Sequence, residues 1–143
     1  MEKIKIIILV GPDGAGKTTL KREIESRCNY KYFVIDRLTD SIVYNKLYNR
    51  TSPSESQILM FEYEFSLIAD VNLVYVYADV DTLLERLKYK NESGDIAYLK
   101  KTMRLFDEYL KKTYFKKIKI NTCKLTISDT ADIIIKTVDN KNE

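Results

Sequence analysis

Three of the four glycines in this 143-residue chain, Gly11, Gly14 and Gly16, lie within six consecutive positions. They belong to the segment IILVGPDGAGKTT (residues 7–19), which continues a run of branched apolar residues and leads into a segment with helical spacing. This order predicts a buried strand that turns sharply into a helix. Glycine allows the positive φ angles and the close backbone approach that such a loop needs, so this segment sets the start of the fold.

The residues GPDGAGKT also match the pattern G-x-x-x-x-G-K-[ST], in which a loop holds a polyphosphate. Inward-pointing backbone N–H groups and the positive end of the following helix together attract the phosphates. Lys17 is predicted to bridge the β- and γ-phosphates of ATP, and the Thr18 hydroxyl to hold Mg²⁺. The predicted ATP-binding residues are Gly11, Asp13, Gly14, Ala15, Gly16, Lys17, Thr18 and Thr19.

Strand-like and helix-like segments alternate along the rest of the chain. Apolar, β-branched segments predict strands at residues 3–10, 30–36, 73–79 and 115–121. Helices are predicted at 16–28, 41–48, 55–69, 96–114 and 130–138, the last capped by Ser128 or Asp129, and another runs from an Asp81 N-cap to a break at 91–95. The alternation predicts an α/β three-layer sandwich around a short, four-stranded parallel sheet, in one domain spanning residues 1–143.

Composition removes several classes of function. Histidine is absent, which excludes Ser-His-Asp and Cys-His catalysis and every His metal site. Lys and Arg exceed Asp and Glu by only 24 to 21, and the lysines are scattered, so no nucleic-acid partner is expected. Cys28 and Cys123 lack a metal-binding spacing, which predicts reduced, buried thiols in a cytoplasmic protein. The first apolar run ends at Gly11, too early for a secretory signal, and no membrane partner is expected.

Asp36 and Arg37 stand at the end of the second predicted strand, in the segment IDRLTDSIVYN. The carboxyl ends of parallel strands line the ligand crevice, so Asp36 is predicted close to the Mg²⁺ held by Thr18, with Arg37 forked onto a second phosphate. A kinase needs such a second anion site. The Asp-Glu strand end of motor ATPases and the Asn-Lys-x-Asp base reader of GTPases are both missing.

These segments resemble the thymidylate kinase group of P-loop nucleoside monophosphate kinases, including its small phage-type members. The group's phosphate loop is similar to GPDGAGKTT and favours an acidic residue at the place of Asp13. Its Asp-Arg segment resembles DRLTDSIVY, and the strand and helix before its lid resemble VYADVDTLLERL. The matching blocks run from residue 6 to about residue 90. The resemblance implies a nucleoside monophosphate kinase-like fold.

The resemblance also implies roles for the matched positions. Asp13 would accept the 3′-hydroxyl of the acceptor sugar, Arg37 would grip its 5′-phosphate, and Tyr44 would press on its 2′ face. Charge on the transferring phosphoryl group would be neutralised from a small lid around residues 86–97. The predicted catalytic residues are Lys17, Asp36, Arg37, Arg86, Lys88 and Lys90, the acceptor-binding residues are Asp13, Arg37, Ser41, Tyr44 and Arg50, and the metal ligands are Thr18 and Asp36.

The chain departs from this group where the acceptor base should bind. The usual Arg-Glu-Pro strand and base-stacking helix are missing, which leaves Tyr48, Arg50, Phe61 and Tyr63 as candidates. The predicted function is phosphoryl transfer from Mg-ATP to a (deoxy)nucleoside 5′-monophosphate such as dTMP. The alternatives are a polynucleotide 5′-kinase or small-metabolite kinase, and a non-catalytic nucleotide-binding module. A homodimer is a further expectation, through the helix that carries Phe61, Tyr63 and Phe65.

Overall fold

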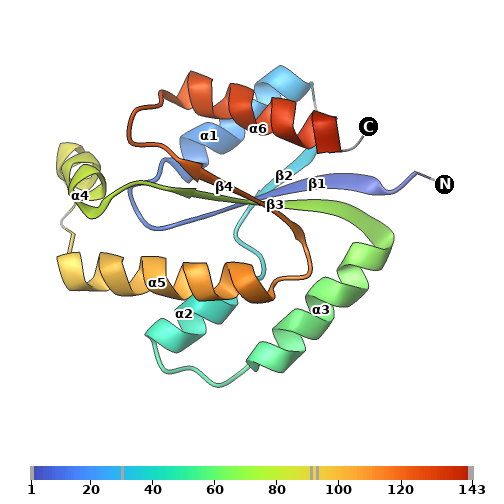
Figure 1. Ribbon diagram of the computed structural model, residues 1–143, viewed down its shortest axis with the longest axis horizontal. Coiled ribbons are helices and arrows are strands. Elements are labelled where there is room, and N and C mark those ends of the chain that lie inside the picture. The colour runs from blue at the N-terminus through green and yellow to red at the C-terminus, as the bar shows by residue number, and fades with distance from the viewer. Residues whose placement is uncertain (1, 30, 91, 93, 142–143) are drawn as a thin grey trace.

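One or two helices follow each strand in the part of the chain that the computed structural model describes, residues 2–29, 31–90, 92 and 94–141 (Figure 1). The elements are, in chain order, β1 (Ile4–Val10), α1 (Lys17–Cys28), β2 (Phe33–Asp36), α2 (Ser41–Leu47), α3 (Glu55–Ile68), β3 (Ala69–Tyr77), α4 (Val80–Tyr89), α5 (Ile96–Lys112), β4 (Lys116–Asn121) and α6 (Ile127–Lys141).

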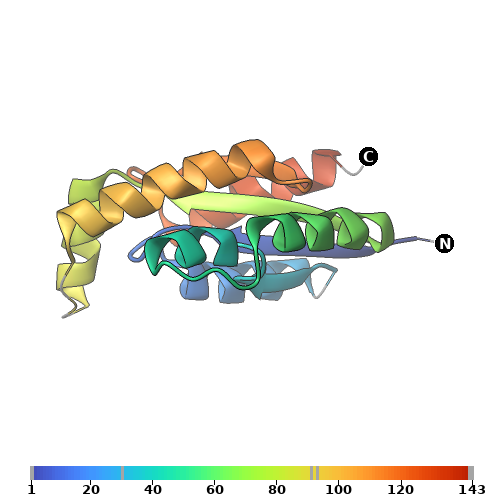
Figure 2. The ribbon, with the colours of Figure 1, turned by 90° about the horizontal axis from the view of Figure 1, so that it is seen from below.

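The sheet has the strand order β2-β1-β3-β4, and all of its neighbouring strands are parallel. Helices α1 and α6 lie on one face, and α2, α3 and α5 lie on the other (Figures 1 and 2). Helix α4 lies beyond the carboxyl ends of the strands, at the same end as the turn from β1 into α1 (Figure 1). The predicted α/β three-layer sandwich with four parallel strands is confirmed.

Residues 6–10 of β1 are buried on both faces of the sheet, which explains why this part of the strand is an unbroken apolar run. Ile7 and Leu9 pack under α1 and α6, against Leu20 of α1. Ile6 and Ile8 point to the other face, in the cluster that α2, α3 and α5 cover. The glycine-rich loop therefore starts from a rigid, fully buried support.

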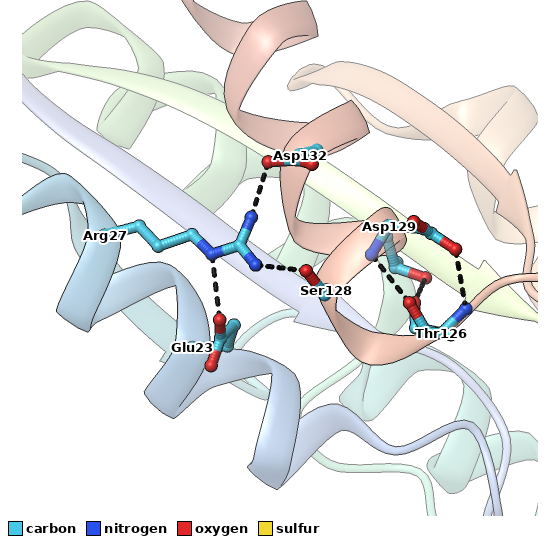
Figure 3. A network of polar contacts seen from close by, with 7 residues as sticks. Glu23, Arg27, Thr126, Ser128, Asp129 and Asp132 are labelled. Atoms are coloured by element: carbon cyan, nitrogen blue, oxygen red, sulfur yellow. Dashed lines mark hydrogen bonds and ion pairs between the residues drawn. The ribbon is translucent and has the colours of Figure 1, made fainter.

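Helices α1 and α6 are joined by the side chain of Arg27 (Figure 3). Its guanidinium donates to Glu23 of its own helix, and to Ser128 and Asp132 of α6. Helix α1 begins at the glycine-rich loop, so this contact holds the loop's helix to the rest of its layer.

The N-caps of two helices differ from their predicted positions. Asp79, not Asp81, caps α4, since the Thr82 N–H donates to its carboxylate at 2.8 Å and Asp81 lies inside the first turn. Helix α6 begins at Ile127, earlier than predicted, because Thr126 and Asp129 form a reciprocal capping box (Figure 3). The predicted caps Ser128 and Asp129 are therefore wrong, because both lie inside the first turn of α6; Ser128 accepts a hydrogen bond from Arg27.

Other boundaries shift by a few residues. Strand β3 begins at Ala69, four residues before the predicted start, because it pairs along the whole of β1. The predicted helix break at 91–95 includes Asn91 and Ser93, and the predicted second strand includes Tyr30, all of which lie outside the described residues. Cys28 and Cys123 are free thiols as expected, but they are half-buried instead of buried. In the described part of the chain, no helix is long and apolar enough to cross a membrane.

Candidate functional site

The glycine-rich loop, residues 11–16, follows the carboxyl end of β1 and turns directly into α1. A Cβ atom on Gly11 would lie 2.1 Å from the carbonyl oxygen of Val76, so the loop passes too close to β3 for any side chain. Gly16 is the N-cap of α1 with φ 82°, a left-handed conformation that favours glycine. These two constraints explain why the glycines crowd into this segment.

Lys17 lies at the first turn of α1 and folds back over this loop. Its ammonium donates to the carbonyl oxygens of Gly11 at 2.5 Å and Pro12 at 3.1 Å. Burial lowers the pKa of Lys17 to about 8, and the nearby carboxylate of Asp13 only partly opposes that shift. A half-buried ammonium that donates to two carbonyl oxygens is well placed to bind an anion.

A polar cavity of about 340 Å³ opens in front of the loop. It brings together residues from the loop, the end of β2 and the end of α4, which are far apart in sequence. The lining residues are Asp13, Gly14, Gly16, Lys17, Thr18, Thr19, Asp36, Arg37, Lys90 and Glu92. Most of the residues predicted for phosphate and metal binding therefore lie around one cavity.

Arg37 follows the end of β2 and has an unusual backbone conformation. Its φ is 74°, a strained value for a residue other than glycine. The guanidinium lies 5.1 Å from the centre of the Tyr44 ring, which fixes its direction. The loop thus presents an exposed guanidinium to the same cavity that Lys17 lines.

Asp40 is a site residue that the sequence analysis did not select. Its side chain is buried, and it accepts a hydrogen bond from the Leu38 N–H at 3.0 Å. Burial raises the pKa of the Asp40 carboxyl, although the charges of Arg37 and Lys17 lower it in part. Asp40 is the N-cap residue of α2, but its side chain makes no cap hydrogen bond to that helix. The carboxyl instead closes the turn that carries Arg37.

Thr18 and Asp36 supply a hydroxyl and a carboxylate to the polar cavity. These hard oxygen ligands suit Mg²⁺, which is usually held by one or two carboxylates together with substrate phosphates. No cluster of three or more Asp, Glu or Cys ligands occurs within the described residues. The two residues fit a cation that arrives with a nucleotide.

A second and more apolar cavity, of about 520 Å³, adjoins the first along the loop. Arg86 forms part of its wall, where the guanidinium donates to the Thr122 hydroxyl at 2.9 Å and to the Thr122 carbonyl at 2.8 Å. The other lining residues include Leu20, Thr82, Tyr89, Cys123, Leu125 and Ile127. Apolar walls with a few fixed polar groups are typical of pockets that bind small molecules.

The three cations predicted for the lid differ in their surroundings. Arg86 is held at the wall of the apolar cavity, Lys90 lines both cavities, and Lys88 is exposed and lines neither. The loop after α4 includes residues outside the described part of the chain. Lys90 is therefore the lid cation that reaches the polar cavity.

A row of aromatic and cationic side chains runs along α2, away from Arg37. The rings of Tyr44 and Tyr48 stack with centres 6.5 Å apart, and the Arg50 guanidinium lies 5.1 Å from the centre of the Tyr48 ring. The Tyr48 hydroxyl is 2.9 Å from that of Tyr98 on α5. Burial and this hydrogen bond raise the pKa of Tyr98 to about 12.

The other predicted acceptor residues lie elsewhere. Ser41 is the half-buried first residue of α2 and lines neither cavity. Phe61 and Tyr63 of α3 make ring contacts with Phe65 and Tyr114, not with the row along α2. Of the four candidates for base contacts, only Tyr48 and Arg50 belong to the row that begins at Arg37.

No family model and no curated protein sequence matches the chain. Solved structures do match its fold. The YorR protein of Bacillus subtilis, solved in complex with phosphorylated GDP, is similar at a TM-score of 0.80 and 21% identity, over 96% of this chain and 98% of that one.

Two kinases are also similar. Deoxyadenosine kinase from M. mycoides, solved with dCTP, matches at a TM-score of 0.69 and 13% identity, over 94% of this chain and 99% of that one. Thymidylate kinase from Candida albicans matches at 0.58 and 12%, over 98% and 93%. At such identities these matches show a shared fold, the α/β fold of P-loop nucleotide kinases.

Proposed function

We propose that this chain transfers the γ-phosphoryl group of Mg-ATP to the 5′-phosphate of a nucleoside monophosphate, with a deoxynucleotide such as dTMP as the acceptor. One observation carries the proposal: Lys17 of the phosphate loop and Arg37 of the β2–α2 loop line the same polar cavity. A site with a cation for each of two phosphate groups serves transfer between nucleotides better than hydrolysis.

The two adjoining cavities give the donor its orientation. The triphosphate would lie in the polar cavity, against the loop and the positive end of α1. The base would lie in the apolar cavity, between Leu125 and the Arg86 side chain that Thr122 holds. Both cavities share Gly14, Gly16 and Thr19, so one nucleotide can span them.

Phosphoryl transfer asks for positioning and charge stabilisation more than for acid–base groups, which suits a chain without histidine. Mg²⁺ on Thr18 and Asp36 would neutralise charge on the β- and γ-phosphates. Lys17 would hold the same oxygens from the loop side, and Lys90 from the α4 side. Arg37 would fix the acceptor phosphate in line with the donor.

The acceptor would extend along α2. With its phosphate at Arg37, its sugar would contact Tyr44, and its base would reach Tyr48, Arg50 and Tyr98. Asp13 lines the cavity beside Arg37, where it would accept the sugar's 3′-hydroxyl. Stacking on tyrosine tolerates every base, which leaves the choice of base to the groups at its edge.

The test is a panel of acceptors incubated with Mg-ATP: the dNMPs, the NMPs, the deoxynucleosides and 5′-hydroxyl oligonucleotides, with products separated by chromatography. Diphosphates formed from monophosphates support the proposal. Phosphorylated nucleosides or end-labelled oligonucleotides would identify a kinase with a hydroxyl acceptor instead. ATP binding without any product would identify a nucleotide-binding module.

A homodimer through α3 is also proposed. The exposed side of α3 carries Met60, Phe61, Leu67 and Ile68, which are 44–73% exposed, whereas Phe65 packs inward. Their spacing puts them on one side of the helix, around the exposed Glu64, and exposed apolar side chains gathered in this way are typical of an interface. Sedimentation should show a dimer that Leu67→Glu dissociates. A monomeric wild-type protein would contradict this proposal.

A further inference from the structure

Glu62 of α3 is a fully buried carboxyl in the layer beneath the acceptor side of the site. It accepts hydrogen bonds from the Tyr109 hydroxyl at 2.5 Å, the Thr113 hydroxyl at 2.7 Å and the Tyr114 N–H at 3.1 Å. A buried carboxyl is costly unless several donors satisfy it. These three donors compensate for the burial of the Glu62 carboxyl, at a position where most proteins would have an apolar residue.

The direction of the hydrogen bonds follows from counting protons. The Tyr109 hydroxyl has one proton, and it is directed to Glu62. The Thr39 hydroxyl lies 2.6 Å from the Tyr109 oxygen, so Thr39 must be the donor in that pair. Burial raises the pKa of Tyr109, and the Glu62 carboxylate adds to that shift, which keeps the hydroxyl protonated at any working pH. The chain of donors therefore runs from Thr39 through Tyr109 to Glu62.

Thr39 belongs to the same loop as Arg37. It is buried, and the loop is also tied by the Arg37 N–H to Leu9 of β1 at 3.4 Å and by the Leu38 N–H to Asp40. The bond from Arg37 to β1 is long, and the φ of Arg37 is strained. A strained loop keeps its conformation only when its surroundings hold it there. The hydrogen bond from the Thr39 hydroxyl to Tyr109 of α5 helps to hold the loop in this conformation.

We propose that Tyr109, anchored on Glu62, is a positioning residue that holds the Arg37 loop through Thr39, so that the acceptor's phosphate meets a preformed guanidinium. The inference rests on the proposed function, because it assigns to Arg37 the acceptor phosphate. Tyr109 touches neither cavity, and its effect on the acceptor passes through the loop.

Tyr109→Phe removes the hydroxyl and keeps the ring. The KM for the acceptor nucleotide should rise about tenfold, which corresponds to the loss of a buried hydrogen bond, while kcat and the Kd for Mg-ATP change less than about twofold. Tyr75→Phe is the matched control. Tyr75 is also a buried tyrosine that packs on Phe106, but no hydrogen bond joins its hydroxyl to the loop. Its acceptor KM should stay at the wild-type value.

Thr39→Val removes the same hydrogen bond from the loop side and should reproduce the rise in KM. Thr39→Ser keeps the hydroxyl and should have the wild-type KM. The double variant should show no further rise, because both changes break one path. A loss of stability with unchanged KM would make Tyr109 merely structural and would overturn the proposal. So would equal KM shifts in Tyr109→Phe and Tyr75→Phe.

Amide hydrogen exchange separates this inference from the proposed function. The amides of residues 37–40 should exchange about tenfold faster in Tyr109→Phe than in Tyr75→Phe, whether or not any acceptor is phosphorylated. If the wild-type protein phosphorylates no nucleotide, the proposed function fails and the exchange comparison still decides the inference. Equal exchange at residues 37–40 in the two variants would overturn it.

Discussion

The ammonium of Lys17 lies 2.5 Å from the carbonyl oxygen of Gly11, a contact that holds it over the glycine-rich loop. Carbonyls stabilise a cation less than phosphates do, and burial lowers the pKa of Lys17 to about 8. A bound triphosphate would favour the charged ammonium and raise that pKa. Nucleotide binding must then take up a proton wherever free Lys17 is neutral.

The affinity for Mg-ATP should therefore depend on pH above 8. It should fall only about twofold between pH 7 and 8, and then by up to about tenfold per pH unit as Lys17 loses its proton. Calorimetry at pH 9 in two buffers of different ionisation enthalpy measures the proton uptake directly. In Lys17→Arg the side chain stays charged, so any remaining binding should lose this dependence. Equal affinities at pH 7.5 and 9.5 in the wild-type protein contradict the prediction.

Lys17→Met should abolish ATP binding and yet stabilise the free protein. The pKa of Lys17 is 10.5 when unfolded and about 8 when folded, so the unfolded chain binds more protons between these values and stability rises with pH across that window. Below pH 8 the folded protein bears the full cost of a buried charge. Denaturant unfolding at pH 7 should show a gain on the order of 1 kcal/mol for the variant, which shrinks by pH 10. A destabilised variant at pH 7 would show that the loop carbonyls satisfy the ammonium.

Arg37 invites a comparison of two substitutions. Arg37→Ala and Arg37→Gly should both abolish phosphoryl transfer, because both remove the guanidinium proposed to bind the acceptor phosphate. The affinity for Mg-ATP should stay within about threefold of the wild-type value. They should differ in stability. Glycine adopts the positive φ of 74° without strain. The free energy of unfolding of Arg37→Gly should therefore exceed that of Arg37→Ala by about 1 kcal/mol in denaturant unfolding. Equal loss of ATP binding and transfer would give Arg37 a structural role.

The start of the fold could be predicted from the sequence because it depends on the local conformation of a few residues. The glycine pattern predicted a loop because Gly11 passes Val76 and Gly16 adopts a left-handed conformation, constraints that are written in the residues themselves. Helix N-caps were less predictable. Asp79 and Asp81 are equally good capping residues, and only the place where β3 ends selects Asp79.

The sequence predicts which segments meet where a general rule of parallel sheets joins them, and it does not where only the packing of side chains joins them. The pairing of Lys17 with Arg37 followed from the rule for parallel strand ends. The contact of Arg86 with Thr122, 36 residues apart, had no signal in the sequence, and neither did the link from Thr39 to Tyr109. Buried polar networks of this kind become visible only when the helices are packed.

Asn72 offers a test of the core beneath the site. Within the described residues its buried side-chain amide has no hydrogen-bond partner, although it lies in the middle of the sheet on β3. Asn72→Val replaces it with a branched side chain of similar size and should stabilise the protein by about 1–3 kcal/mol in denaturant unfolding. Asn72→Asp should destabilise it, because an unpaired charge would be buried. A destabilised Asn72→Val would reveal a partner, such as an internal water.

Arg86, Lys88 and Lys90 differ in the cavities that they line, so substituting each one should change the kinetic constants differently. Arg86→Gln breaks the contact with Thr122 at the wall of the apolar cavity, so the KM for ATP should rise about tenfold with little change in kcat. Lys90 lines the polar cavity, and Lys90→Gln should lower kcat by about tenfold to a hundredfold, because charge develops there only during transfer. Lys88→Gln is the matched control. Lys88 lines neither cavity, so the loss of one positive charge there should leave both constants unchanged. Steady-state kinetics with varied ATP resolves the three patterns, and equal effects from all three substitutions would mean that the lid acts through its total charge and not through placed residues.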